Sequence, residues 1–129
     1  MTYCLAVSAV VAMNRRLVEQ TAEPHAVLSM GNLEGALARP LASFGGVEVF
    51  ATLPAKAGAL LDGIAQAHAF LQGNKRTAWL AAVTYLGING LSLVGVSQDE
   101  AADVVLRVVV HELDAQGVAV WLADRLEFV

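Results

Sequence analysis

A short stretch between His68 and Ala78 collects the side chains that could do chemistry. It reads His-Ala-Phe-Leu-Gln-Gly-Asn-Lys-Arg-Thr-Ala and combines a titratable imidazole, a glycine, an amide and two adjacent cations. Imidazole titrates near neutral pH and can act as a general base. Lys75 and Arg76 can hold phosphate oxygens, the arginine as a planar fork and the lysine as a point charge. The stretch therefore predicts an anion site that suits phosphate.

Helical patterns on both sides would position this stretch. Upstream, apolar residues at three- or four-residue spacing predict a helix that begins near Leu53 and ends at His68, with His68 on its inward face. Downstream, the same spacing predicts a second helix from Asn74 or Lys75. Gly73 permits unusual backbone torsions and Asn74 is a good N-cap. The loop would thus present free backbone N–H groups and the positive end of a helix dipole.

Each of these residues also has an ordinary structural interpretation. A single histidine on an apolar face is usually a core residue, a Lys-Arg pair on a first helical turn usually lies in solvent, and Gly-Asn is a common turn. Two cations at the positive end of a helix are electrostatically unfavourable, however. The combination favours an anion site over separate structural roles.

Residues 68–77 resemble the Fic/Doc motif. The ending Asn-Lys-Arg-Thr-Ala resembles the Doc (death-on-curing) branch, because the Fic branch has glycine where this chain has Lys75. Flanking segments at residues 32–40, 44–46 and 86–90 are also similar to Doc-like proteins. The resemblance extends from about Asn14 to the C-terminus.

The resemblance implies an all-α fold, a compact Fic/Doc-type helical bundle with a small β-like flap, in a single domain over residues 1–129. In the proteins that this chain resembles, the flap region, here residues 44–50, lies over the active cleft and helps to position the target. An ordinary connecting loop is the alternative interpretation of that segment. The site roles that the resemblance implies are a general base at His68, a structural anchor at Phe70, and phosphate or nucleotide binding by Gly73, Asn74, Lys75 and Arg76.

One position departs from the family pattern. Gln72 stands where the family has Asp or Glu to bind the Mg²⁺ that bridges nucleotide phosphates. An amide oxygen can ligate a hard cation but brings no negative charge, so the affinity for Mg²⁺ should fall. Asp62 or Glu48 could replace the missing acid only if the fold brings one of them close. The implied cofactors are ATP and a weakly held Mg²⁺, with Gln72 as the candidate metal ligand.

The resemblance implies a toxin of a toxin–antitoxin system that transfers the terminal phosphate of ATP to a hydroxyl of elongation factor Tu and arrests translation. Two alternatives stay open: a catalytically impaired Fic/Doc-fold binding protein, because of Gln72, and a nucleotidyltransferase, which Lys75 disfavours. An inhibitory Ser/Thr-x-x-x-Glu-Gly/Asn element is not found, since Met30 precedes Glu34-Gly35 where Ser or Thr is required. Restraint is therefore expected from a separate antitoxin of the prevent-host-death type.

Composition agrees with a small helical protein. The 129 residues are 57% hydrophobic and 6% aromatic, and this length suffices for a core without disulfides or structural metals. The net charge of −4 offers no basic face for nucleic acid. The single cysteine, Cys4, excludes an internal disulfide and suits a reducing cytosol, so a cytoplasmic location is expected.

The remaining chain is expected to be mostly helical. Residues 77–98 carry no charge, but glycines interrupt them, so we expect a buried helix, a turn and an extended piece and no membrane role. Further helices are predicted at residues 6–21, 33–38, 98–113 and 118–128. Asn32 would cap the second of these, and Ser97 with Glu100 forms a capping box for the third. His25 is expected to face solvent beside Pro24.

Overall fold

The helices of this chain pack around one central helix, α3. The structure, a computed structural model, describes residues 2–129. Its elements in chain order are α1 (Val7–Gln20), α2 (Met30–Ala38), the 3-10 turn η1 (Arg39–Leu41), β1 (Ser43–Phe44), β2 (Val47–Glu48), α3 (Leu53–Ala67), α4 (Asn74–Ile88), β3 (Leu91–Leu93), α5 (Gln98–Val109), α6 (Ala115–Ala123) and β4 (Leu126–Phe128). The predicted all-α bundle is confirmed, with two small two-stranded sheets added to it.

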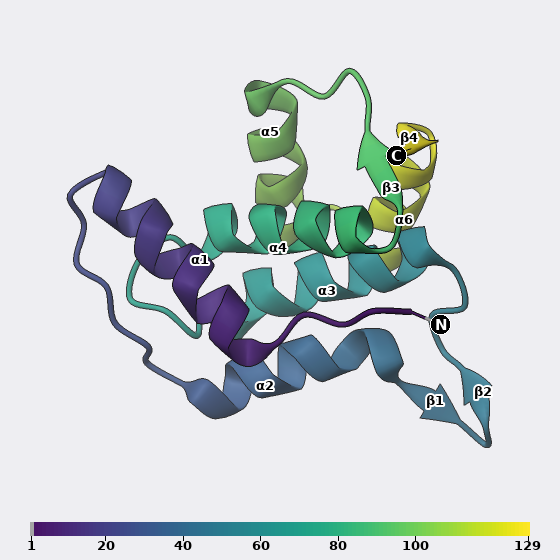
Figure 1. Cartoon of the computed structure of the whole chain (residues 1–129), viewed down its shortest axis with the longest axis horizontal. Helices are drawn as coiled ribbons and strands as arrows, with labels where there is room; N and C mark the ends of the chain where they lie inside the picture. The colour runs from purple at the N-terminus through teal and green to yellow at the C-terminus, as the bar shows by residue number, and fades with distance from the viewer. Residues whose placement is uncertain (1) are drawn as a thin grey trace.

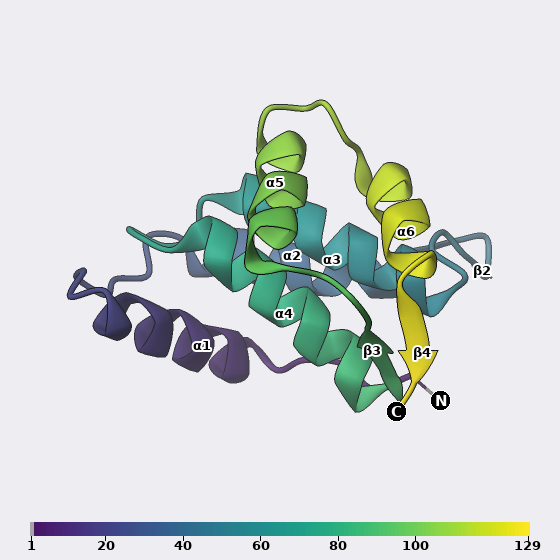
Figure 2. The same cartoon turned by 90° about the horizontal axis from the view of Figure 1, so that it is seen from above.

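Helix α3 is buried on most of its circumference because small residues let its neighbours approach closely. It contacts α2, α4, α5 and α6, and it lies between them in Figures 1 and 2. An ideal Cβ on Gly58 would lie 2.6 Å from the carbonyl oxygen of Ala115, so only glycine allows α6 this close. Leu60, Leu61 and Ile64 are 0 to 1% exposed and form the middle of the core. The predicted start of this helix is confirmed, with Thr52 as its N-cap.

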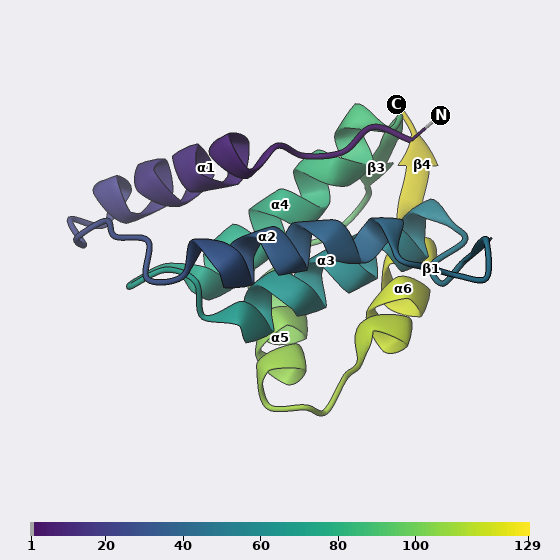
Figure 3. The same ribbon diagram turned by 90° about the horizontal axis from the view of Figure 1, so that it is seen from below.

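Helices α3 and α4 run antiparallel and are joined by a short loop, residues 68–73. Helix α1 lies across α4 beside this loop, as Figures 1 and 3 show. Of the uncharged residues 77–98, the first part forms α4, the chain turns at Gly90 with φ of 88°, and β3 follows. The predicted helix, turn and extended piece are therefore confirmed. No helix in the described part of the chain combines the length and the apolar character that crossing a membrane requires.

The predicted flap forms at the expected residues, but it does not lie over the candidate site. Strands β1 and β2 pair antiparallel through Phe44 and Val47, with a tight turn at Gly45 and Gly46. This hairpin precedes α3, whereas the 68–73 loop follows α3, and the two lie at opposite ends of that helix (Figure 1). The 15 residues of α3 separate them by about 22 Å. The expectation that the flap covers the candidate site is therefore wrong for this chain.

A buried lysine holds the hairpin at its end of α3. Lys56 is 3% exposed, and its Nζ donates to the Pro40 carbonyl oxygen at 3.1 Å and to Glu48 Oε1 at 2.9 Å. A buried ammonium requires such partners because desolvation of the charge is costly. The pair ties β2 to the first turns of α3.

The C-terminal helix was predicted too long. Helix α6 begins at Ala115, where the Asp114 side chain accepts from the Gly117 N–H, and it ends at Ala123. Residues 126–128 form β4, which pairs with β3 from Leu91↔Phe128 to Leu93↔Leu126. The short strand β3 leaves backbone groups that need partners, and the end of the chain supplies them.

Two helix ends also differ from the prediction. Helix α5 has the predicted capping box but ends at Val109, because His111 adopts a φ of 63° and the Glu112 N–H turns back to the Arg107 carbonyl. Helix α2 begins at Met30, and its cap is Ser29, which accepts from the Asn32 N–H at 3.1 Å. Asn32 therefore lies inside the helix that it was predicted to cap.

Candidate functional site

The 68–73 loop is shaped by two left-handed residues. His68 has φ of 47° at the end of α3, and Gly73 has φ of 76° as the N-cap of α4. Helix α4 makes its first backbone bond from the Thr77 N–H to the Gly73 carbonyl, so the N–H groups of Asn74, Lys75 and Arg76 have no acceptor within the helix. Three N–H groups and the positive end of the α4 dipole therefore point out of the loop.

His68 is exposed, and its predicted inward position is wrong. Helix α3 ends at Ala67, one residue before His68, and the left-handed backbone turns His68 out of the helical register. The next two residues, Ala69 and Phe70, are 0 and 1% exposed and enter the core instead. Phe70 is thus a core anchor of the loop, as predicted. An exposed imidazole on this loop is accessible to a reacting hydroxyl.

The segment before α2 supports the loop through backbone pairing. The Leu28 N–H donates to the Ala69 carbonyl at 2.7 Å, and the Leu71 N–H donates to the Ala26 carbonyl at 3.0 Å. Between these bonds, Val27 and Phe70 form an antiparallel bridge. The loop therefore has a defined backbone partner that is distant in the chain, since Leu28 and Ala69 are 41 positions apart and Ala26 and Leu71 are 45 apart.

Asn74 closes the loop on itself. Its side-chain oxygen accepts from the Phe70 N–H at 3.0 Å, and its Nδ2 donates to the Phe70 carbonyl at 2.8 Å. The prediction that Asn74 is the N-cap of the second helix is wrong, because Gly73 occupies that position. Asn74 instead holds the loop in a fixed shape, and it offers its backbone N–H to an anion.

Asn14 of α1 is a site residue that sequence reasoning missed. It is 1% exposed, and its Nδ2 donates to the Gln72 carbonyl oxygen at 2.8 Å and to Thr77 Oγ1 at 3.0 Å. Its Oδ1 lies 2.9 Å from His25 Nδ1, so the prediction that His25 faces solvent is wrong. The available signal was the spacing of Val10, Asn14 and Val18, which places a polar residue in the buried stripe of α1.

Arg76, one of the two predicted phosphate-binding cations, has partners within the chain. Its Nη2 forms an ion pair with Glu23 Oε1 at 2.5 Å, and its Nη1 donates to Thr21 Oγ1 at 3.1 Å. Hydrogen bonding from the Thr21 hydroxyl, and then from Arg76, lowers the pKa of the Glu23 carboxyl below its ordinary value. The guanidinium that was expected to bind phosphate is thus already paired with the Glu23 carboxylate.

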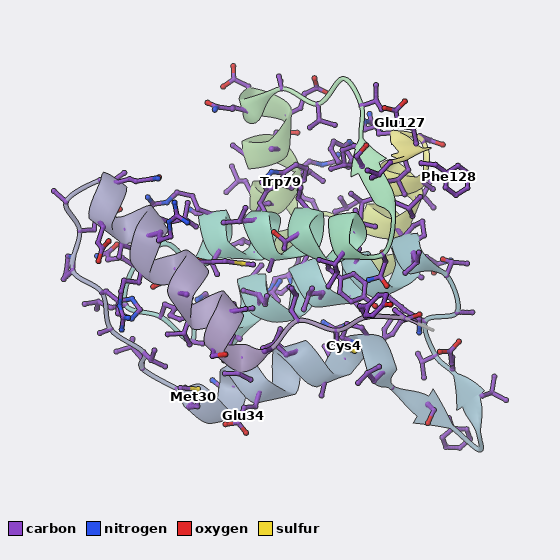
Figure 4. All side chains as sticks on the ribbon, viewed as in Figure 1. Cys4, Met30, Glu34, Trp79, Glu127 and Phe128 are labelled. Atoms are coloured by element: carbon purple, nitrogen blue, oxygen red, sulfur yellow. The ribbon has the colours of Figure 1, made fainter. Side chains whose placement is uncertain are left out.

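Lys75 has no such partner in residues 2–129. It is exposed and takes part in none of the ion pairs found there. Lys75 and Arg76 line a groove of about 660 Å³ between α1, α4 and α5. The groove walls are mainly apolar and include Leu17, Trp79, Leu80, Ala101, Val105 and Leu106. Figure 4 labels Trp79 between α4 and α5.

The carboxylates that could have replaced a missing metal ligand are engaged elsewhere. Asp62 pairs with Arg39 at 2.7 Å on α3, and Glu48 pairs with Lys56 at the hairpin. Within residues 2–129, no three His, Cys, Asp or Glu side chains gather as a metal site. The exposed Gln72 therefore stands without a carboxylate partner on the loop. This donor set suits a phosphate group but does not fit a firmly held Mg²⁺.

Comparisons with known proteins match the part of the chain that carries the loop. The model of the Fic/DOC family matches residues 4–86, which include the whole loop and nearly all of α4. The chain is also similar to Toxin Doc of Mycolicibacterium smegmatis, with 43% identity over 98 residues that cover 75% of each chain.

Proposed function

The chain belongs to the Fic/DOC family, and on that basis we propose that it is the toxin of a toxin–antitoxin system and acts as an ATP-dependent phosphotransferase. The observation that carries the proposal is the loop itself. An exposed His68 precedes by a few residues the start of α4, where three N–H groups and Lys75 have no partner among residues 2–129. A proton acceptor and an anion cradle are the two parts that phosphate transfer requires of a protein.

The proposed reaction moves the terminal phosphate of ATP to a protein hydroxyl. The hydroxyl oxygen attacks the γ-phosphorus, the bond from that phosphorus to the bridging oxygen breaks, and ADP leaves. His68 accepts the hydroxyl proton. Lys75 and the N–H groups of residues 73–76 hold the phosphate oxygens and stabilise their charge. No step is assigned to Mg²⁺, whose affinity we expect to be low because Gln72 supplies no charge.

The proposed target is a threonine of elongation factor Tu, and the proposed result is arrested translation, as the resemblance to Doc implies. Lys75 favours transfer of the terminal phosphate over transfer of a nucleotidyl group, because the nucleotidyl-transferring members have glycine at that position. The β1–β2 hairpin lies at the other end of α3 from the loop (Figure 1). We therefore do not assign this hairpin a part in holding the target.

A second candidate function is a Fic/Doc-fold protein that binds without catalysis. Two observations favour it. Gln72 stands where the family has a metal-binding Asp or Glu, and Arg76 is already paired with Glu23. Such a protein would keep the groove and its partner but would turn over slowly or not at all.

We propose an antitoxin of the prevent-host-death type as the partner of either form. The groove between α1, α4 and α5 has a mainly apolar lining that also includes Lys75 and Arg76. An amphipathic helix with an apolar face and an acidic residue would complement both features. Bound there, it would also cover Lys75 and so restrain the enzyme.

The test is transfer of label from γ-labelled ATP to purified elongation factor Tu in the presence of Mg²⁺, with the natural protein, His68→Ala and Gln72→Asp compared side by side. Incorporation that disappears in the His68 variant supports the kinase and the general-base role together. Label from α-labelled ATP would instead identify a nucleotidyltransferase. Incorporation by Gln72→Asp alone would identify a binding protein descended from an enzyme.

A further inference from the structure

A buried side chain outside the motif holds the motif loop in place. Asn14 lies on α1 and is 1% exposed, and its side-chain amide donates two hydrogen bonds, one to the Gln72 carbonyl oxygen and one to Thr77 Oγ1. We propose that Asn14 is a positioning residue that orients the Gly73 N–H for phosphate binding. This inference rests on the proposed function, since it concerns the same anion site.

The geometry of the peptide bond carries the argument. Asn14 Nδ2 holds the Gln72 carbonyl oxygen at 2.8 Å, so this carbonyl points toward α1. In a planar trans peptide the carbonyl and the following N–H point in opposite directions. The Gly73 N–H must therefore point away from α1. It is next in the chain to the N–H groups of the first turn of α4, which have no backbone partner in the described part of the chain. We infer that these donors bind one phosphate together.

His25 fixes which way round the Asn14 amide lies. Both Nδ2 protons are directed at acceptors, so Oδ1 is the atom that faces His25 Nδ1 at 2.9 Å, and His25 donates from Nδ1. Turning the amide over would set an oxygen against the Gln72 carbonyl oxygen. The His25 bond therefore secures the donor that the loop needs.

Close packing prevents the loop from moving toward α1. An ideal Cβ on Gly73 would lie 3.0 Å from Val18 Cγ1 and 3.2 Å from Asn14 Nδ2. Helix α1 thus lies directly against the backbone of Gly73, and the Gln72 carbonyl has a single direction in which it is satisfied. A loss of the Asn14 donor would leave that carbonyl without its partner and would release the peptide to rotate.

The test uses ¹⁵N-labelled protein and inorganic phosphate as the probe. Phosphate should shift the Gly73 amide resonance in the natural protein. In Asn14→Leu, which is neutral and has the same number and branching of side-chain heavy atoms, the Gly73 resonance should move even without phosphate. The phosphate affinity should fall by about tenfold, the effect of losing one charge-assisted hydrogen bond. The matched control is Thr77→Val, which removes the other acceptor of Asn14 and leaves the bond to Gln72 in place.

A merely structural role predicts a different result from a positioning role. If Asn14 only stabilises the fold, Asn14→Leu and Thr77→Val should weaken phosphate binding in proportion to their losses in thermal stability, and that outcome would overturn the proposal. If Asn14→Leu does not fold, Asn14→Asp retains partners for His25 and Thr77 but replaces the donor to Gln72. Its Gly73 resonance should then be displaced in the absence of phosphate, and an unchanged resonance would overturn the proposal.

The proposed reaction and the role of Asn14 fail in different ways. A natural protein that transfers no phosphate but shows the phosphate-dependent shift of Gly73, lost in Asn14→Leu, rejects the reaction and supports the positioning role. If the Gly73 resonance of the natural protein does not shift at any phosphate concentration, the proposed anion site and the proposed role of Asn14 are both rejected.

Discussion

The Glu23 carboxylate lies 2.5 Å from the Arg76 guanidinium, so a cation of the motif forms an ion pair with a carboxylate of the same chain. Glu23 follows α1 and Arg76 belongs to the first turn of α4. The contact fastens the end of α1 to the motif loop. It also means that a phosphate must compete with Glu23 before Arg76 can bind it.

Glu23→Gln should therefore raise the affinity for phosphate. The variant removes the competing charge and leaves Arg76 able to form charge-assisted bonds to the anion, which we expect to tighten binding by roughly three- to tenfold. Titration with inorganic phosphate at low salt measures the effect. Glu19→Gln is the matched control, because it removes the same charge from an exposed position on α1. Equal gains in both variants would show that only the net charge matters.

The Glu23–Arg76 ion pair should make a pH-dependent contribution to the stability of the folded protein. Since Thr21 and Arg76 lower the pKa of Glu23 in the folded chain, the unfolded chain takes up this proton first as the pH falls. The stabilisation is therefore fully present above the ordinary glutamate pKa of about 4.3 and is lost as the pH falls through the lowered value. The difference in melting temperature between the natural protein and Glu23→Gln should be constant from about pH 5 to 8 and should vanish in more acidic solution.

Local patterns predicted much of the fold, whereas partners distant in the chain were not predictable. The helix, loop and helix around residues 53–88 follow from apolar spacing and a glycine, and they are confirmed. The bond from Asn14 to Gln72 joins residues 58 positions apart, and the bond from Arg76 to Glu23 joins residues 53 apart. No periodicity in the sequence encodes such pairings, because they depend on how α1 lies against α4.

The errors at His68 and at the C-terminus have a similar cause. His68 continues the apolar spacing of α3, but the backbone leaves the helix one residue earlier, and a left-handed residue at that point cannot be recognised from spacing. Residues 126–128 continue the pattern of α6, but β3 recruits them as its partner strand. In both cases a tertiary requirement overrode a local preference.

Gln72→Asp should increase the affinity for Mg²⁺ in the presence of ATP, because a carboxylate adds the negative charge that an amide lacks. We expect a gain on the order of tenfold, measured by calorimetric titration of Mg²⁺ into the ATP complex. Leu71→Asp is the control, since Leu71 is exposed on the same loop and receives the same charge. A similar gain in the control would mean that general electrostatic attraction, and not ligation at position 72, accounts for the effect.

Gly73→Ala should destabilise the protein and distort the loop. A φ of 76° is unfavourable for alanine, and the new Cβ would lie 3.0 Å from Val18 Cγ1. The expected loss in the free energy of unfolding is about 1–3 kcal/mol. Gly87→Ala is the contrasting variant, because Gly87 lies in α4 with nothing within 4 Å of its ideal Cβ. It should gain about 0.5–1 kcal/mol in urea denaturation. Comparable losses in both variants would contradict this account.

Tyr85→Phe should stabilise the protein, and more so in alkaline solution. The Tyr85 hydroxyl is buried and has no hydrogen-bond partner among the described residues, so its removal should increase the free energy of unfolding by about 1 kcal/mol near neutral pH.

Burial raises the pKa of Tyr85 from 10.0 to about 12. The unfolded chain therefore loses this proton first, and the natural protein should lose stability as the pH rises from about 10 to 12. Chemical denaturation across that range should show a smaller loss for Tyr85→Phe than for the natural protein. Tyr3→Phe, at a position that is 60% exposed, should leave the alkaline loss unchanged. An equal loss in Tyr85→Phe would mean that another group titrates in this range.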